Sequence, residues 1–232
     1  MSGFADLLSV KMDLANVIYI SYRLPVSRIR PLIPNVLPVA SDHNNNAFVS
    51  FVAMSCRRVR LSAFPWPRFN YDQLNLRTYI RDPKTGDPAV YFFQSGVSLG
   101  IIPPITHLAG IPWEKISFQL HSDGVSGYQA SGQWRDDIHF EIVAPDGELP
   151  EDSVVEHLTG PMMGFMGSNG KLRSFRISHR ALEVRPARLK SIEFSMPINN
   201  GLITADKLRQ PDSVLMVPHA QFTVYLPPRR II

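Results

Sequence analysis

A regular alternation of polar and apolar side chains between Tyr71 and Ile80 constrains the fold of this chain more than any other feature. Polar groups stand at every second position, and mostly apolar groups fill the positions between them. A period of two places the two kinds of side chain on opposite faces of a β-strand. The polar members are Tyr71, Gln73, Asn75, Arg77 and Tyr79. The sequence therefore predicts a strand with one apolar face and one face of hydrogen-bonding groups.

This polar face has two interpretations. Phenols, amides and a guanidinium suit a ligand pocket or a buried hydrogen-bond network, whereas solvated strands more often carry Lys, Glu and Thr. A solvated face with its tyrosines packed under loops fits the same alternation. Residues 81–88 contain two prolines and Gly86, so residues 89–95 are expected to return as an antiparallel strand. Phe93 in that strand joins the candidate pocket residues.

Twenty prolines and fourteen glycines divide the remaining chain into short runs. Many of these runs alternate, which predicts a mainly β fold of antiparallel sheets. The continuous apolar run at residues 47–54 is typical of a strand buried on both faces. The aromatic, Pro-rich loop at residues 63–69 is expected to form one wall of a pocket. Short helices are expected at 4–12, 26–31 and 151–159.

Length and charge limit the function classes. The 232 residues are 44% hydrophobic and contain no linker-like tract, which predicts one domain spanning residues 1–232. The net charge is +4, but the arginines are scattered and no basic helix or RNA-binding motif accompanies them. A pocket for an anionic ligand therefore fits the charge better than nucleic acid does. No signal peptide or membrane-spanning segment is recognised, so we expect a cytoplasmic protein without a membrane partner.

Cysteine and histidine usage gives no indication of a metal or cofactor. The single cysteine, Cys56, excludes an intrachain disulfide and a multi-cysteine zinc site. It is either an inert strand residue or a nucleophile. The histidines lack metal-site spacing, and no phosphate loop or Gly-x-Ser-x-Gly motif occurs. His179 and Glu183 are four residues apart, which permits a structural hydrogen bond or a ligand contact.

Several segments resemble a known family. Residues 71–80, followed by Gly-Asp-Pro-Ala-Val-Tyr-Phe-Phe at 86–93, resemble the core "N-x-R-T-Y-V … G-V-x-F-F" of the DUF2071 family. Residues 158–159 and 176–179 are similar to two later family stretches, although the residues that follow each depart from its pattern. The resemblance covers about residues 16–185 and implies the fold of acetoacetate decarboxylase, a β-barrel or cone around a central cavity.

Acetoacetate decarboxylase forms a Schiff base on the first lysine of a Gly-[Phe/Tyr]-Pro-Lys-Lys turn, and a neighbouring cation activates that lysine. The similar turn here begins at Gly110, and Trp113 and Glu114 occupy the two lysine positions. Lys115 lies one residue later, and such a shift in a strand turns a side chain to the opposite face. Gln73 stands at a glutamate position of the enzyme and cannot act as a general base. Authentic acetoacetate decarboxylase activity is therefore not expected.

Two kinds of function remain open. The first is a lyase- or decarboxylase-like enzyme for a small oxo- or carboxylic acid, with Arg77 as the carboxylate anchor and Glu114 and Lys115 as catalytic candidates. The second is a non-catalytic barrel that binds a small apolar or anionic ligand. A small molecule is the partner expected in both, and a homo-oligomer is left open. The ligand-binding candidates are Tyr71, Gln73, Asn75, Arg77, Tyr79, Phe93, Trp113 and His179.

Overall fold

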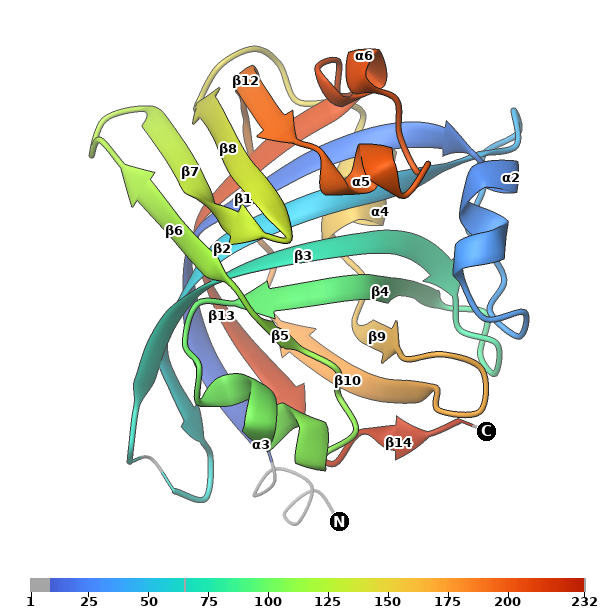
Figure 1. Ribbon diagram of the computed structural model, residues 1–232, viewed down its shortest axis with the longest axis vertical. Helices are drawn as coiled ribbons and strands as arrows, with labels where there is room; N and C mark the ends of the chain where they lie inside the picture. The colour runs from blue at the N-terminus through green and yellow to red at the C-terminus, as the bar shows by residue number, and fades with distance from the viewer. Residues whose placement is uncertain (1–8, 65, 232) are drawn as a thin grey trace.

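The computed structural model describes residues 9–64 and 66–231, and a closed β-barrel forms its centre (Figure 1). Seven strands follow one another in the order β13, β1, β2, β3, β4, β9 and β10, and β10 pairs again with β13. All these pairs are antiparallel except β4 with β9. The predicted mainly antiparallel barrel is confirmed. The bounds are β1 Ser9–Pro25, β2 Asn46–Leu61, β3 Phe69–Arg81, β4 Pro88–Val97, β9 Met163–Met166, β10 Arg173–His179 and β13 Ser213–Tyr225.

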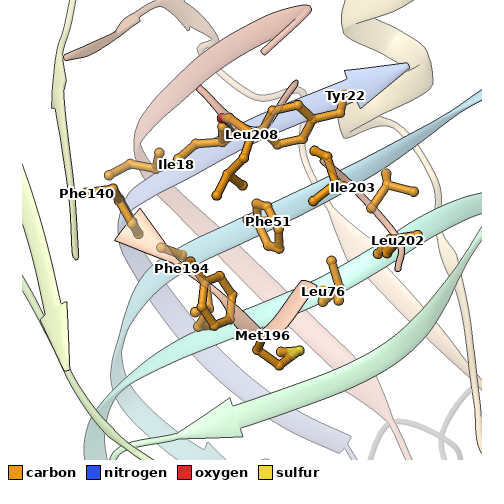
Figure 2. Close-up of a cluster of buried hydrophobic side chains, with 14 of the residues drawn as sticks. Ile18, Tyr22, Phe51, Leu76, Phe140, Phe194, Met196, Leu202, Ile203 and Leu208 are labelled. Atoms are coloured by element: carbon orange, nitrogen blue, oxygen red, sulfur yellow. Dashed lines mark hydrogen bonds between the residues drawn. The ribbon is translucent and has the colours of Figure 1, made fainter. Parts of the chain in front are cut away.

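A second, antiparallel sheet packs on the outside of the barrel. It consists of β12 (Arg188–Phe194), β8 (Asp136–Val143), β7 (Gly127–Trp134) and β6 (Ser117–Ser122), in that order. Figure 2 shows Phe140 and Phe194 of this sheet facing Ile18, Phe51 and Leu76 of the barrel. Three two-residue strands extend the barrel sheet: β5 (Glu114–Lys115), β11 (Arg185–Pro186) and β14 (Arg229–Arg230).

The barrel strands serve two separate cores because their side chains alternate in direction. In β1, Ile18 and Ile20 point outward to the second sheet, whereas Val17 and Tyr19 point into the barrel. In β2, residues 47–56 are all buried. The expectation of a strand buried on both faces is therefore confirmed, and the continuous apolar run reflects two cores rather than one.

The described α-helices are short, with four to eight residues each. The predicted helix at 26–31 is confirmed as α2 and a following 3-10 turn, and that at 151–159 as α4. The helix predicted at 4–12 is wrong over residues 9–12, which belong to β1 and pair with β13; residues 4–8 lie outside the described residues. No described helix is long and apolar enough to cross a membrane. The bounds are α2 Val26–Ile29, α3 Ile102–Leu108, α4 Asp152–Thr159, α5 Met196–Asn199 and α6 Ala205–Leu208.

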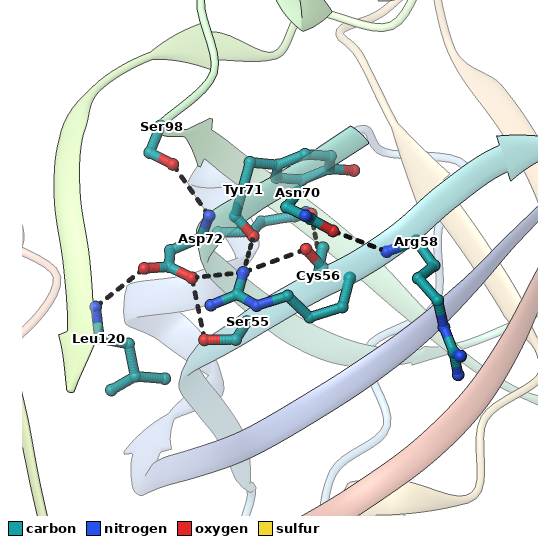
Figure 3. Close-up of polar contacts among 10 residues, drawn as sticks. Ser55, Cys56, Arg58, Asn70, Tyr71, Asp72, Ser98 and Leu120 are labelled. Atoms are coloured by element: carbon teal, nitrogen blue, oxygen red, sulfur yellow. Dashed lines mark hydrogen bonds and ion pairs between the residues drawn. The ribbon is translucent and has the colours of Figure 1, made fainter. Parts of the chain in front are cut away.

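Asp72, on the outer face of β3, links the barrel to the second sheet (Figure 3). Its carboxylate accepts the backbone N–H of Leu120 at 3.0 Å and the hydroxyl of Ser55 at 2.9 Å, and it pairs with Arg57 at 3.0 Å. The Asp72 N–H donates to the Ser98 hydroxyl at 2.9 Å. These bonds hold β6 against β3 at the end of the barrel where the β2–β3 connection lies.

Candidate functional site

The polar face of β3 points into the barrel. Tyr71, Gln73, Asn75 and Tyr79 are buried, with at most 6% of each residue exposed. Arg77 keeps a small exposed fraction, but its Nε is buried. The interpretation of this row as a solvated face is therefore wrong. It forms the inner polar stripe that the other interpretation predicted.

Arg77 lies at the end of the barrel that α4 closes. Its Nη2 donates to the Leu158 carbonyl oxygen at 2.8 Å and to the Tyr79 hydroxyl at 3.3 Å. The guanidinium also lies over the rings of Tyr19 and Tyr79, at 5.2 and 5.3 Å. Leu158 is in the last turn of α4, where carbonyl oxygens carry the negative end of the helix dipole. Arg77 therefore binds the C-terminal end of a helix, and no carboxylate of the described residues pairs with it.

The same network continues into the barrel wall. The Tyr79 hydroxyl lies 2.9 Å from that of Ser50, which lies 2.7 Å from the Ser21 hydroxyl. The Leu158 carbonyl oxygen also accepts from Tyr79 at 3.2 Å. A buried network whose members have partners fixes one arrangement of the strands around it. The closed end is thus held by polar contacts between β1, β2, β3 and α4.

His157, which the sequence did not indicate, completes the closed end. Its ring lies 4.8 Å from that of Tyr79 and 5.7 Å from that of Phe48. Burial lowers the pKa of His157, and the positive charges of Arg81, Arg77 and Arg23 lower it further. A neutral imidazole therefore packs on the tyrosine. The sequence does not predict this contact, because a single histidine in the last turn of a short helix carries no motif that would place it beside Tyr79.

Further along the barrel, the inner polar groups bond to one another. Gln73 Nε2 donates to Asn75 Oδ1 at 2.8 Å, and the Cys56 thiol donates to Gln73 Oε1 at 3.6 Å. Burial raises the pKa of Cys56 to about 12. The thiol is consequently protonated at neutral pH, which favours the interpretation of Cys56 as an inert strand residue.

A cavity of about 250 Å³ lies at the opposite end of the barrel, between α3 and the ends of β1, β2 and β3. Tyr71 and Trp113 line it, but Gln73, Asn75 and Arg77 are not part of its described wall. Arg60 is the one charged side chain among the described lining residues. The expectation that the loop at 63–69 forms a pocket wall is confirmed, since Phe64, Trp66, Pro67 and Phe69 line this cavity.

Glu114 and Lys115 lie outside this cavity, so their proposed place in the pocket is corrected. The Glu114 carboxylate accepts from the indole N–H of Trp134 at 2.9 Å and pairs with Arg135 at 3.4 Å. Lys115 is exposed, and its Nζ donates to the Ile116 carbonyl oxygen at 2.9 Å. Trp113 faces the cavity, and the next residue along the short strand β5 points toward the second sheet. Neither Glu114 nor Lys115 is among the described residues that line the cavity beside Trp113.

Phe93 and His179 also lie away from the cavity. Phe92 lies opposite Arg77 and faces the inner core, so the alternation of side chains along β4 directs Phe93 to the outer core, 5.6 Å from the ring of Tyr91. His179 stacks on Phe222 with ring centroids 4.5 Å apart. The hydrogen bond considered between His179 and Glu183 does not form: Glu183 pairs with Arg185 at 2.6 Å, and His179 Nδ1 lies 2.8 Å from the Arg180 carbonyl oxygen.

Comparison with known proteins decides the family. The model of the DUF2071 family, described as uncharacterized conserved proteins, matches residues 11–221. The chain belongs to the DUF2071 family. No sequence among curated proteins matches this DUF2071 chain.

Solved structures show which fold the DUF2071 chain shares. Acetoacetate decarboxylase from Legionella pneumophila is 12% identical, with a TM-score of 0.63 over 97% of this chain and 87% of that one. An acetoacetate decarboxylase-like enzyme from Sphingomonas wittichii RW1 is 10% identical, with a TM-score of 0.64 over 97% and 93%. The enduracididine biosynthesis enzyme MppR, complexed with pyruvate, is 9% identical, with a TM-score of 0.63 over 97% and 90%. At these identities the likeness establishes the acetoacetate decarboxylase-like fold.

In this DUF2071 chain a tryptophan stands where the resemblance places the Schiff-base lysine. The turn that carries it needs Gly110, which has a φ of 73° and whose missing Cβ would lie 2.9 Å from Arg173 Nε. His107 Nε2 lies 2.8 Å from the Trp113 carbonyl oxygen and fixes the turn to α3. The Trp113 indole N–H is buried and has no acceptor among the described residues. The site therefore has an apolar wall, and one buried hydrogen-bond donor within that wall has no acceptor among the described residues.

Proposed function

We propose that this DUF2071 protein binds a small, mainly apolar ligand in the cavity beside α3, without Schiff-base chemistry. This cavity lies at the end of the barrel opposite α4, which we call the open end. The observation that carries the proposal is the cavity wall, in which aromatic and aliphatic side chains surround a volume of about 250 Å³. Small-molecule sites are typically apolar cavities of roughly 300–1,000 Å³ with a few polar groups. The cavity lies just below this range, so the expected ligand is small.

The unpaired indole N–H defines the polar end of this ligand. A buried donor without an acceptor costs about 1–3 kcal/mol, and a ligand oxygen within reach would remove that cost. Trp113 therefore favours a ligand with an oxo or carboxyl oxygen attached to an apolar body. The solved relatives support this chemistry by analogy, since one of them is complexed with pyruvate.

The absence of an amine from the described cavity wall argues against covalent catalysis. A Schiff base needs a lysine with a lowered pKa beside the carbonyl carbon of its substrate. Among the described lining residues there is none, and the exposed Lys115 uses its amine on the Ile116 carbonyl oxygen. We expect borohydride with acetoacetate to leave the protein unmodified. A covalent adduct on Lys115 would overturn this part of the proposal.

A second candidate function is the capture of a small carboxylate by Arg77. One observation favours it: the Arg77 Nε is buried and has no acceptor, and no described carboxylate pairs with this arginine. A ligand there would compete with the Leu158 carbonyl oxygen for the same fork. It would bind at the closed end and would depend on charge rather than on apolar contact.

Calorimetric titration with benzylacetone, phenylpyruvate and pyruvate separates the two candidates. The proposal predicts that the two aromatic compounds bind at least about tenfold more tightly than pyruvate, because only their rings bury apolar surface against the cavity wall. The Trp113→Phe variant should weaken the binding of both aromatic compounds by about fivefold through the lost hydrogen bond. If pyruvate binds as tightly as phenylpyruvate and Arg77→Met abolishes both, the second candidate is correct. If none of the three binds, the proposal is wrong.

A further inference from the structure

The cavity opens among exposed apolar side chains. In the connection between β2 and β3, Phe64 is 69% exposed and Trp66 is 79% exposed. Ile101, the N-cap residue of α3, is exposed, as are Ile105 and Leu108 within the helix, and Leu108 reaches 92%. Both segments belong to one surface, since Phe64, Trp66 and Ile105 line the same cavity, and Figure 1 shows α3 and the β2–β3 connection at one end of the barrel. We call Phe64, Trp66, Ile101, Ile105 and Leu108 the apolar rim.

The stripe on α3 is regular. Ile101, Ile105 and Leu108 follow one another at spacings of four and three, which places them on one face of the helix. The adjacent face of α3, with Ile102 and Thr106, lines the cavity instead. The exposed stripe is therefore separate from the face that packs on the barrel. Contiguous exposed apolar surfaces of this kind mark contacts with another molecule or with a membrane.

The charges around the apolar rim are of one sign. Residues 55–71 contain four arginines and no Asp or Glu, and residues 98–113 contain no charged side chain apart from His107. Arg60 lines the cavity and lies opposite Lys11 in the pairing of β1 with β2. No described carboxylate pairs with Lys11 or Arg60. The nearest acid on β1, Asp13, is already paired with Arg58.

We propose that the apolar rim docks this protein on an anionic lipid surface, so that the cavity opens toward the bilayer. Amphipathic aromatic side chains sit at the boundary between headgroups and acyl chains, and basic residues beside them are attracted to anionic lipids. A second copy of the chain is a poorer occupant, because a symmetric contact would bring the arginines of both copies together. Surface docking needs no membrane-spanning segment, so the earlier expectation of no membrane partner is revised. An apolar ligand would then reach the cavity without crossing water.

Flotation with phospholipid vesicles tests this proposal. The protein should float with vesicles that contain phosphatidylglycerol, float far less with pure phosphatidylcholine, and detach at high salt. Phe64→Ser with Trp66→Ser should lower the partition coefficient by more than about tenfold, because two large apolar side chains no longer insert. Lys11→Gln with Arg60→Gln should lower it by about fivefold for each charge removed, on anionic vesicles only.

Matched controls keep the outcome specific. Val125→Ser removes an exposed apolar side chain from the β6–β7 turn, and Arg28→Gln with Lys84→Gln removes two exposed charges at other sites. Neither control should change flotation. The proposal is overturned if the wild-type protein does not float, or if the rim variants float as it does. A dimer that forms without lipid and dissociates in the Phe64/Trp66 variant would assign the rim to self-association instead. A wild-type protein that binds benzylacetone in solution but does not float would refute the docking alone and leave the proposed function standing.

Discussion

The two ends of the barrel differ in the polarity of their side chains. At the closed end, Arg77 and Tyr79 bond to the last turn of α4, and a neutral His157 packs against the tyrosine ring there. At the open end, apolar side chains surround a cavity that Trp113 lines without using its indole N–H. The polar stripe that attracts attention in the sequence therefore serves mainly to close the barrel. The less conspicuous aromatic loop and α3 form the apolar cavity of about 250 Å³.

The largest effect is expected at the closed end. Arg77→Ala leaves the Leu158 carbonyl oxygen and the Tyr79 hydroxyl without their charged donor, so the free energy of unfolding should fall by about 2–3 kcal/mol. Urea denaturation measures this loss. Arg81→Ala is the control, because Arg81 is exposed and donates to the Gly86 carbonyl oxygen at the surface. If Arg77→Ala leaves stability unchanged but abolishes carboxylate binding, the closed end is the ligand-binding site rather than a structural closure.

A charge at the open end should affect binding rather than stability. Ile105→Glu places a carboxylate in the cavity wall, so the affinity for benzylacetone should fall at least about tenfold. Because Ile105 is half exposed, the free energy of unfolding should change by less than about 0.5 kcal/mol. Ile101→Glu on the same helix is the matched control, since Ile101 does not line the cavity. Equal losses in both variants would show that the ligand does not enter beside α3.

The closed end should also make stability depend on pH through His157. Its pKa is lowered in the folded protein, so the unfolded chain binds the proton more readily. The resulting stabilisation is complete above the unfolded pKa of about 6.5 and is lost as the pH falls through the folded pKa. His157→Phe should flatten the change in unfolding free energy between about pH 7 and pH 5. His121→Gln, at an exposed position, should retain the wild-type slope; a slope that survives in His157→Phe would point to another group.

The smallest effect is expected for Glu114, which belongs to neither end. Glu114→Gln loses a half-exposed ion pair with Arg135 and keeps an acceptor for the Trp134 N–H, so stability should change by less than about 1 kcal/mol. Benzylacetone affinity should be unchanged. A large loss of affinity in this variant, measured by the same titration, would restore Glu114 to the site.

The sequence predicts those features that depend on local pattern. Alternation identified the inner face of β3, and the acidic start and Gly-Pro end of residues 151–159 located α4. Three other outcomes depend on contacts that no local pattern records. The register of β4 on β3 placed Phe92 opposite Arg77 and so turned Phe93 outward, the pairing of β5 with β4 directed Glu114 to the second sheet, and ladder bonds on both sides made residues 9–12 a strand. The roles of Arg77 and His157 were hidden because they depend on contacts between β3 and α4, which lie about eighty positions apart in the chain.

The pairing of β1 with β13 determines when the barrel can form during synthesis. Ser9 lies opposite Tyr225 and Ser21 opposite Ser213. The strand β1 therefore cannot complete its pairing until β13 has been synthesised. Contacts between residues so distant in sequence make folding slow, because the loop between them must close first. Until the ribosome has released residues 213–225, β1 keeps one unpaired edge, and unpaired edges bind other chains. The nascent protein therefore depends on protection from aggregation until residues 213–225 have emerged and paired with β1.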